Sequence, residues 1–280
     1  MSSTPLIVIC APNGARIGKT EHDSVPLTAP ELADCAESLV DCGVSVLHLH
    51  VRDNSGRHTL DAQRYREALA SIRERVGDRL ILQVTTEAVG LYNRQQQMAL
   101  VRELRPEAVS LALRELCPDP ESVAEASRFF HAIRRAGCWP QYILYSPAEV
   151  ARFEAMRKDG VFGEDRPFAL FVLGRYSDSL TGEPAELDGF LEACQPVEFP
   201  WAVCCFGPHE AAAISRAATL GGHARIGFEN NRVLPDGEIA ANNAELVSSA
   251  IAAYAAANAP PRPLATADWV RKHLAGTAGG

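Results

Sequence analysis

The sequence lacks any apolar run long enough for a membrane-spanning helix. Residues 1–10 have no basic segment before their short apolar run, which argues against a secretory signal peptide. Basic residues are too few for a nucleic-acid surface, because 27 Lys and Arg against 35 Asp and Glu give a net charge of −8. The 8 cysteines form no Cys-x-x-Cys pair, which excludes a zinc knuckle and a redox dithiol. We therefore expect a cytoplasmic protein with free thiols.

What the sequence does contain is a regular alternation of short apolar strands and amphipathic helices. The predicted strands cover 6–10, 44–50, 80–85, 108–113, 142–145, 168–173, 201–206 and 224–228. Each precedes a predicted helix, at 30–42, 61–76, 94–104, 120–136, 147–158, 185–194, 209–220 and 243–257. Eight such units predict a (β/α)8 TIM barrel, an α/β fold that forms a single domain over 1–280. A short helical tail is expected from about 260. An open doubly wound sheet is the alternative, but it usually has a glycine-rich turn after its first strand.

Two histidines stand at the end of the second predicted strand. The run from Val44 to Leu47 is apolar, and His48 and His50 follow it before Asn54 interrupts the pattern. Side chains alternate between the two faces of a strand, so His48 and His50 share one face. Imidazole is the usual ligand of zinc and related metals, and the pair therefore predicts a metal site. The alternative is that both are core histidines bonded to backbone carbonyls.

A carboxylate on the last predicted strand completes this candidate site. Arg225, Gly227 and Glu229 share a face of that strand by the two-residue period. The first strand of a closed barrel has the second and the eighth as neighbours, so we expect Glu229 to approach His48 and His50. Two histidines and one carboxylate leave positions open for water or substrate, as in catalytic zinc sites. Arg225 would hold a carboxylate or an oxyanion, or it only neutralises Glu229.

Other polar residues follow the predicted strands, at the end of the barrel where such enzymes work. Thr85 and Ser110 could donate hydrogen bonds to a substrate, and Arg16 could contact it. Each also has a plainer interpretation. Thr85 and Ser110 could be ordinary strand residues, Arg16 a solvated loop residue, and Glu229 the cap of a loop.

Several motifs occur in order along nearly the whole chain: Pro26-Leu27-Thr28, His48-Leu49-His50-Val51-Arg52-Asp53 with Gly56-Arg57, Phe171-Val172-Leu173-Gly174, Gly221-Gly222-His223-Ala224-Arg225-Ile226-Gly227-Phe228-Glu229-Asn230-Asn231, and Pro263-Leu264-Ala265-Thr266. In these motifs the chain resembles the β-keto acid cleavage enzymes. The resemblance implies a zinc-dependent TIM barrel, commonly a homotetramer. It implies a transferase that converts a β-keto acid and acetyl-CoA into acetoacetate and a new acyl-CoA. The family's zinc ligands fall on His48, His50 and Glu229, its substrate-anchoring hydroxyls on Thr85 and Ser110, and its arginine on Arg225.

Two departures from the family pattern matter for the chemistry. The founding enzyme has an aspartate after the ligand glutamate, proposed as the base, whereas Asn230 stands here and cannot take a proton. Glu87 and Glu115 are the alternative candidates for the base. The founding enzyme also holds a substrate amino group with a glutamate where this chain has Arg16, and Arg114 adds positive charge. A guanidinium pairs with a carboxylate and repels an ammonium, so we expect an anionic or neutral substrate tail.

Two other functions are compatible with the sequence. One is a different zinc barrel enzyme, either a hydrolase or an aldolase. Amidohydrolases also carry His-x-His, but their later histidine ligands have no counterpart in His131, His209 or His223, which fall in or beside other elements. The second is a non-catalytic metal- or metabolite-binding barrel, which Asn230 keeps open. A requirement for acetyl-CoA would separate the predicted enzyme from both.

Overall fold

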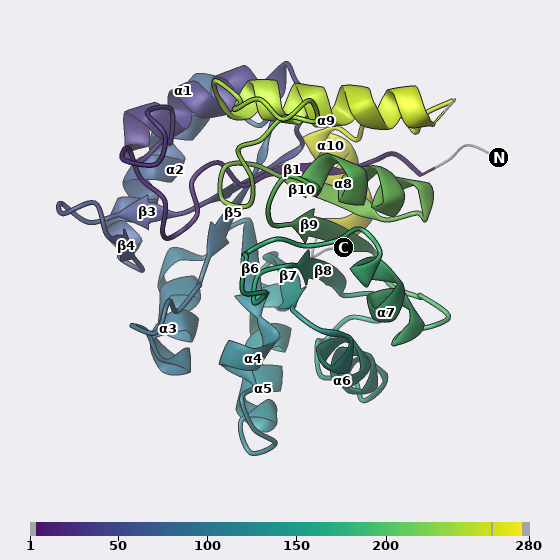
Figure 1. Cartoon of the computed structure of the whole chain (residues 1–280). Helices are drawn as coiled ribbons and strands as arrows, with labels where there is room; N and C mark the ends of the chain where they lie inside the picture. The colour runs from purple at the N-terminus through teal and green to yellow at the C-terminus, as the bar shows by residue number, and fades with distance from the viewer. Residues whose placement is uncertain (1–3, 259, 276–280) are drawn as a thin grey trace.

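The alternating strands and helices close into a barrel, as the sequence predicts (Figure 1). The computed structural model describes residues 4–258 and 260–275. Within these residues eight parallel strands form the closed sheet. Their order around it is β1 (Val8–Cys10), β10 (His223–Ile226), β9 (Trp201–Cys205), β8 (Phe168–Leu173), β7 (Trp139–Leu144), β6 (Ala108–Ala112), β5 (Ile81–Thr85) and β2 (Val46–Leu49). The single-domain TIM barrel is therefore confirmed.

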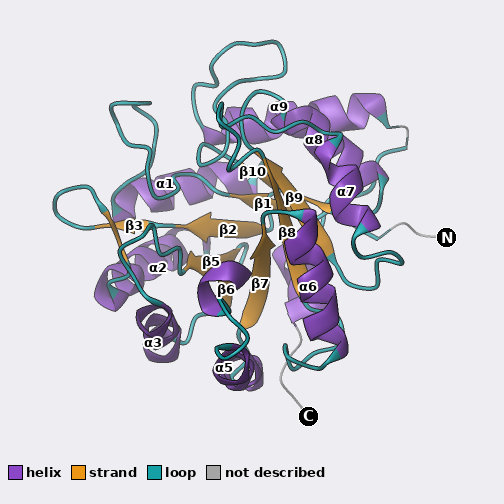
Figure 2. Ribbon diagram, turned by 60° about the horizontal axis from the view of Figure 1, so that its bottom comes forward, coloured by secondary structure: helices purple, strands orange, loops and turns teal. Residues whose placement is uncertain are grey.

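Between successive barrel strands, and after the last one, lies a helix that covers the outside of the sheet (Figure 2). These helices are α1 (Ala29–Val40), α2 (Ala62–Val76), α3 (Arg94–Leu104), α5 (Val123–Arg135), α6 (Pro147–Lys158), α7 (Glu186–Glu192), α8 (Glu210–Thr219) and α9 (Asn243–Ala257). Thr28 caps α1 in a capping box with Glu31. The helix after β10, α9, packs against α1 (Figure 1). This contact joins the two ends of the helical layer.

Several boundaries differ from those that the sequence predicts. Strand β7 begins at Trp139 rather than 142, because Pro140 is accommodated within the ladder. The predicted strand at 224–228 is wrong at its far end, since β10 stops at Ile226. The tail is helical where predicted, as α10 (Ala267–Val270) and a π-helical turn, η1 (Arg271–Ala275). A short helix, α4 (Leu113–Leu116), was not predicted.

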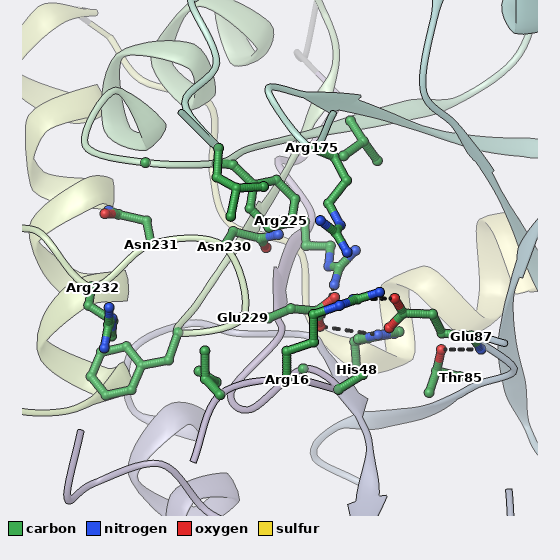
Figure 3. A pocket seen from close by; sticks show the side chains of 18 of the residues that line it. Arg16, His48, Thr85, Glu87, Arg175, Arg225, Glu229, Asn230, Asn231 and Arg232 are labelled. Carbon is green, nitrogen blue, oxygen red and sulfur yellow. Dashed lines mark hydrogen bonds and ion pairs between the residues drawn. The ribbon is translucent and has the colours of Figure 1, made fainter. Parts of the chain in front are cut away.

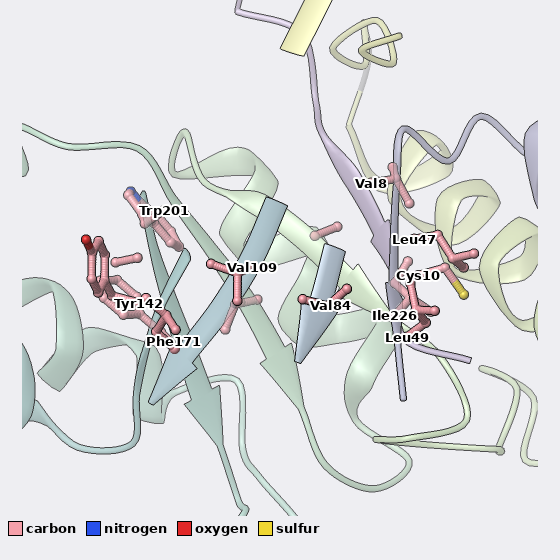
Figure 4. Close-up of a cluster of buried hydrophobic side chains, with 14 of the residues drawn as sticks. Val8, Cys10, Leu47, Leu49, Val84, Val109, Tyr142, Phe171, Trp201 and Ile226 are labelled. Carbon is pink, nitrogen blue, oxygen red and sulfur yellow. The ribbon is translucent and has the colours of Figure 1, made fainter. Parts of the chain in front are cut away.

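The core has two parts, separated by the barrel wall. Outward-facing strand side chains, among them Val8, Leu47 and Val109, pack under the helices (Figure 4). A second cluster, including Val46, Trp139 and Leu170, fills the barrel interior. This packing fixes the strand ends that carry the polar residues.

A two-stranded hairpin interrupts the pattern directly after β2. It consists of β3 (Val51–Arg52) and β4 (His58–Thr59), paired antiparallel. The predicted pattern did not include it. In the described part of the chain, no helix is long and apolar enough to cross a membrane.

Candidate functional site

The two histidines and the glutamate predicted as metal ligands lie together. His48 Nε2 is 3.2 Å from His50 Nε2 and 3.5 Å from Glu229 Oε2. His50 Nε2 is 3.3 Å from the same Glu229 oxygen. Both imidazoles are buried, and the carboxylate is largely so. Three potential ligand atoms therefore face one point at the carboxyl end of the barrel strands.

The end of β2 presents both imidazoles to this point. His48 lies on the strand, and His50 follows it after one residue, so the two side chains leave the same face. Asn13, in the loop after β1, holds the backbone of His50 from both sides. Its Nδ2 donates to the His50 carbonyl at 2.9 Å, and its Oδ1 accepts from the His50 amide at 3.2 Å. The position of the second candidate ligand is thus fixed by the loop after a neighbouring strand.

Each histidine has a partner on its other ring nitrogen. His48 Nδ1 lies 2.9 Å from Gln83 Oε1, which accepts its proton and leaves Nε2 with a free lone pair. His50 Nδ1 lies 3.4 Å from Nδ1 of a third buried histidine, His58. Burial holds the pKa of His48 well below its usual range and lowers that of His58 to about 3. Both are therefore neutral at physiological pH.

Glu229 reaches the histidines through a turn, which corrects the prediction that it lies on a strand face. Strand β10 ends at Ile226, and Gly227 adopts a φ of +144° with its backbone pressed against Ala11. The amides of Asn230 and Asn231 donate back to the Gly227 carbonyl at 2.8 and 3.1 Å. The chain thus folds over, and Glu229 still points at the predicted pair.

Arg225 forms a buried ion pair with Glu229. Its Nη2 lies 2.6 Å from Glu229 Oε2, and only 3% of the residue is exposed. Although burial opposes it, the Arg225 guanidinium holds the pKa of Glu229 well below its usual range. Glu229 is therefore a carboxylate rather than an acid, as a metal ligand must be.

These groups lie at a cavity of about 320 Å³ (Figure 3). Its lining includes Arg16, His48, Thr85, Glu87, Arg225, Glu229 and Asn230 from the predicted set. Arg16 Nη1 pairs with Glu87 Oε1 at 2.7 Å, and Thr85 Oγ1 accepts the Glu87 amide at 3.0 Å. Asn230 is buried, and its amide atoms have no hydrogen-bond partner within residues 4–258 and 260–275. The cavity thus presents free polar groups beside the candidate ligands.

Three other predicted residues, Ser110, Arg114 and Glu115, do not belong to this lining among the described residues. Ser110 is buried on β6, directly opposite Thr85 in the ladder. Arg114 pairs with Glu149 at 2.5 Å and packs between the rings of Tyr145 and Tyr176, at 4.6 Å from each. Its charge is therefore compensated by Glu149.

Glu115 lies beneath the loop after β5, where its Oε2 accepts the Ala88 amide at 3.1 Å. Burial raises its pKa to about 7. The folded state thus favours the protonated form, and the resulting stability is complete below pH 4.5 and lost as the pH rises through 7.

We expect Glu115→Gln to remove this pH-dependent loss of stability. Between pH 5 and pH 8, the unfolding free energy of wild type should fall by about 2 kcal/mol more than that of the variant. Urea unfolding at the two pH values measures this difference.

The exposed Glu103 supplies the matched control for this measurement, since it is paired only with Arg66 at the surface. Glu103→Gln should follow wild type at both pH values. A Glu115→Gln variant that follows wild type as well would contradict the assignment of a buried neutral carboxyl.

The sequence assigns no role to several residues of the site. Gln83 and His58 contact the candidate ligand histidines, and Asn13 holds the backbone of one. Arg175 lines the cavity, with its guanidinium 5.4 Å above the Phe206 ring. A polar side chain inside the apolar run Leu80–Val84 was the available signal for Gln83. For Arg175 the signal was its place directly after a strand.

The three candidate ligands fit a zinc ion. Zinc binds nitrogen and oxygen at roughly 2.0–2.2 Å in a tetrahedral arrangement, which places ligand atoms roughly 3.3–3.5 Å apart. The three distances observed here are 3.2, 3.3 and 3.5 Å. Gly14 belongs to the same packing, since a Cβ at this position would lie 2.5 Å from Glu229 Cγ. Two imidazoles and one carboxylate are a donor set typical of catalytic zinc.

Known proteins resemble this chain along nearly its full length. A sequence profile of the beta-keto acid cleavage enzymes matches residues 5–275. The 3-keto-5-aminohexanoate cleavage enzyme of Fusobacterium nucleatum is 29% identical over 276 residues, covering 96% of this chain and 97% of that protein. The 3-oxoadipate:acetyl-CoA acetyltransferase of Cupriavidus necator is 24% identical over 259 residues, covering 89% and 88%.

A solved structure of a ternary complex of ObcA with a C4-CoA adduct and oxalate has a TM-score of 0.70 at 18% identity. It covers 90% of this chain and 67% of the other, and it supports the barrel fold. The resemblance found in the motifs is thus confirmed, and the chain belongs to the β-keto acid cleavage enzyme family.

Proposed function

We propose that this protein is a zinc-dependent enzyme that cleaves a β-keto acid with an anionic or neutral tail. Acetyl-CoA is the co-substrate, and the products are acetoacetate and a new acyl-CoA. One observation carries the proposal. The side chains of His48, His50 and Glu229 converge at a cavity, and the described lining of this cavity contains four arginines and two glutamates.

Zinc, when bound by these three residues, supplies a Lewis acid that polarises a substrate carbonyl. Arg225 lies next to the ligand carboxylate, and Figure 3 shows its guanidinium and that of Arg175 pointing into the same space. A fixed cation in a water-poor cavity stabilises negative charge that develops on a substrate oxygen. Arg225 has this role in the proposal.

The reaction requires a base. It removes one proton from the carbon between the ketone and the carboxylate of the β-keto acid. That carbon then attacks the thioester carbonyl of acetyl-CoA and expels CoA thiolate. The thiolate adds to the original ketone, the bond from that carbonyl carbon to the attacking carbon breaks, and acetoacetate leaves as an enolate that takes the proton back.

Glu87 is the base in this proposal. It lines the cavity, and the Thr85 hydroxyl oxygen accepts its backbone amide at 3.0 Å, which orders the residue. The raised pKa of Glu115 suits a base, but this carboxyl does not line the cavity in the described residues. Asn230 has no group that takes a proton. Glu87 is thus the carboxylate in the lining that is not a candidate metal ligand.

Arg175 is the cation that we assign to the substrate tail. Arg16 and Arg225 are paired with Glu87 and Glu229, respectively, and Arg232 donates to the backbone carbonyl of Glu21 at 2.7 Å. In the described part of the chain, no carboxylate oxygen lies within 4.0 Å of the guanidinium nitrogens of Arg175. A guanidinium without a partner in a small cavity favours a substrate carboxylate and disfavours an ammonium. The assignment moves the tail contact from Arg16, where the sequence predicted it, to Arg175.

A panel of β-keto acids with acetyl-CoA tests the proposed function, with acyl-CoA products followed by mass spectrometry. A dicarboxylic β-keto acid is expected to have a kcat/KM at least about 100-fold above that of 3-keto-5-aminohexanoate, because like charges at Arg175 cost several kcal/mol. Arg175→Met should reduce this preference mainly through KM. A preference for the amino compound would overturn the tail assignment, and zinc binding without any acyl-CoA product would favour a non-catalytic barrel.

A further inference from the structure

The hairpin after β2 returns the chain to the metal-ligand histidines. Its turn is specified locally, since Asp53 Oδ1 accepts the amides of Ser55 and Arg57 at 2.8 and 3.0 Å. Gly56 supplies the left-handed conformation that the turn requires, with φ at +76°. Strand β4 then pairs with β3 so that His58 lies opposite Arg52. Through this arrangement His58 comes beside His50.

His58 makes one contact with each of its ring nitrogens. Nε2 lies 2.9 Å from the backbone carbonyl of Glu87, and Nδ1 lies 3.4 Å from His50 Nδ1. The residue is 6% exposed, so both contacts are shielded from water. The imidazole therefore links a metal-ligand histidine to the segment that carries the proposed base.

These contacts determine where the protons are. A carbonyl oxygen only accepts, so His58 Nε2 carries a proton, and His58 Nδ1 faces His50 as the acceptor. The facing Nδ1 of His50 must then be the donor. An imidazole that binds a metal through Nε2 carries its single N–H on Nδ1, which is the arrangement that His58 favours. Nε2 of His50 lies 3.3 Å from Glu229 Oε2, and the candidate metal site is between these atoms and His48 Nε2.

We propose that His58 is a positioning residue that fixes the tautomer and orientation of His50 and thereby prepares it to bind zinc. The inference rests on the metal site of the proposed function. Gln83 serves His48 in the same way, by accepting from its Nδ1 at 2.9 Å. Groups that hold the second nitrogen of a ligand histidine typically contribute 10- to 100-fold to metal affinity.

The geometry favours His58 over the other acceptor near His50 Nδ1. Glu87 Oε2 is 4.0 Å from this nitrogen, beyond hydrogen-bond distance, and the other carboxylate oxygen of Glu87 pairs with Arg16. Glu87 thus remains available to a substrate while His58 holds the ligand. Separate residues position the metal ligand and handle the substrate proton.

Two substitutions separate the acceptor role of His58 from its general packing. Asparagine places an acceptor oxygen near the position of Nδ1, whereas glutamine places its amide near the position of Nε2. Zinc affinity, measured by competition with a chromophoric chelator, is expected to fall 10- to 100-fold in His58→Gln. In His58→Asn it should stay within about threefold of wild type. Equal losses in both variants, or no loss in either, would overturn the role of His58.

A measurement on the wild-type chain keeps the inference testable if a variant does not fold. In the Co²⁺-substituted protein, paramagnetically shifted NMR signals should include two exchangeable protons, one on Nδ1 of each ligand histidine. A single such signal would overturn the tautomer assigned to His50. If wild type binds neither Zn²⁺ nor Co²⁺, the metal site itself is wrong, and this result is distinct from the failure of His58 alone.

Discussion

Replacing His48 with alanine is expected to remove zinc from the protein and to lower kcat/KM by at least about 10³-fold. The imidazole supplies one of the three atoms that converge within 4.8 Å of one another. His48 is 2% exposed, so its loss leaves a buried space. His50 and Glu229 alone form an incomplete ligand set for zinc. Zinc content after dialysis and turnover with acetyl-CoA are the two measurements.

The control for this variant is His273→Ala, which changes an exposed histidine in the tail turn η1. It should keep the zinc content and the rate of wild type. Turnover that survives in His48→Ala without zinc would contradict the proposed chemistry. Zinc that stays bound in that variant would contradict the ligand assignment.

The barrel and two of the candidate ligands follow from local sequence patterns. Apolar runs with helices between them define the strands and their order, because parallel strands require helical crossovers. His48 and His50 are one strand repeat apart, so their shared face needs no tertiary information. The capping box of Thr28 and Glu31 is equally local. These features depend on neighbours within a few residues along the chain.

The path of Glu229 shows where a periodic pattern fails. Residues 224–228 look like a continuous strand, but the ladder stops at Ile226. At Gly227 an added Cβ would lie 2.3 Å from the Ala11 carbonyl oxygen, a close approach that only the tertiary structure reveals. Glu229 does lie near the histidines, but it lies on a turn and not on the predicted strand face.

The roles of His58, Arg114 and Arg175 depend on contacts between segments that are distant in the sequence. His58 reaches His50 only because the hairpin at Gly56 reverses the chain. Arg114 looked like a substrate contact, but Glu149 and two tyrosine rings hold it elsewhere. Arg175 has no such carboxylate in the described part of the chain and faces the cavity. Sequence alone does not distinguish a paired arginine from an unpaired one.

Replacing Arg225 with methionine is expected to lower kcat by about 10²- to 10³-fold while the zinc content stays unchanged. Methionine keeps much of the volume and removes the charge. Arg225 is 3% exposed, and its Nε has no hydrogen-bond partner among the described residues, so the guanidinium retains donors for a substrate oxygen. Such a donor acts mainly on the transition state, so kcat should fall more than KM rises.

The combination of lost rate and retained zinc separates this role from metal binding. Glu229 loses its ion pair in Arg225→Met, but zinc compensates the same carboxylate, so the ligand set stays intact. Arg225→Lys keeps the charge without the planar fork and should recover only part of the rate. Arg66→Met, at a surface pair with Glu103, is the matched arginine control and should behave as wild type. Loss of zinc from Arg225→Met would instead show that the arginine acts by holding Glu229 in place.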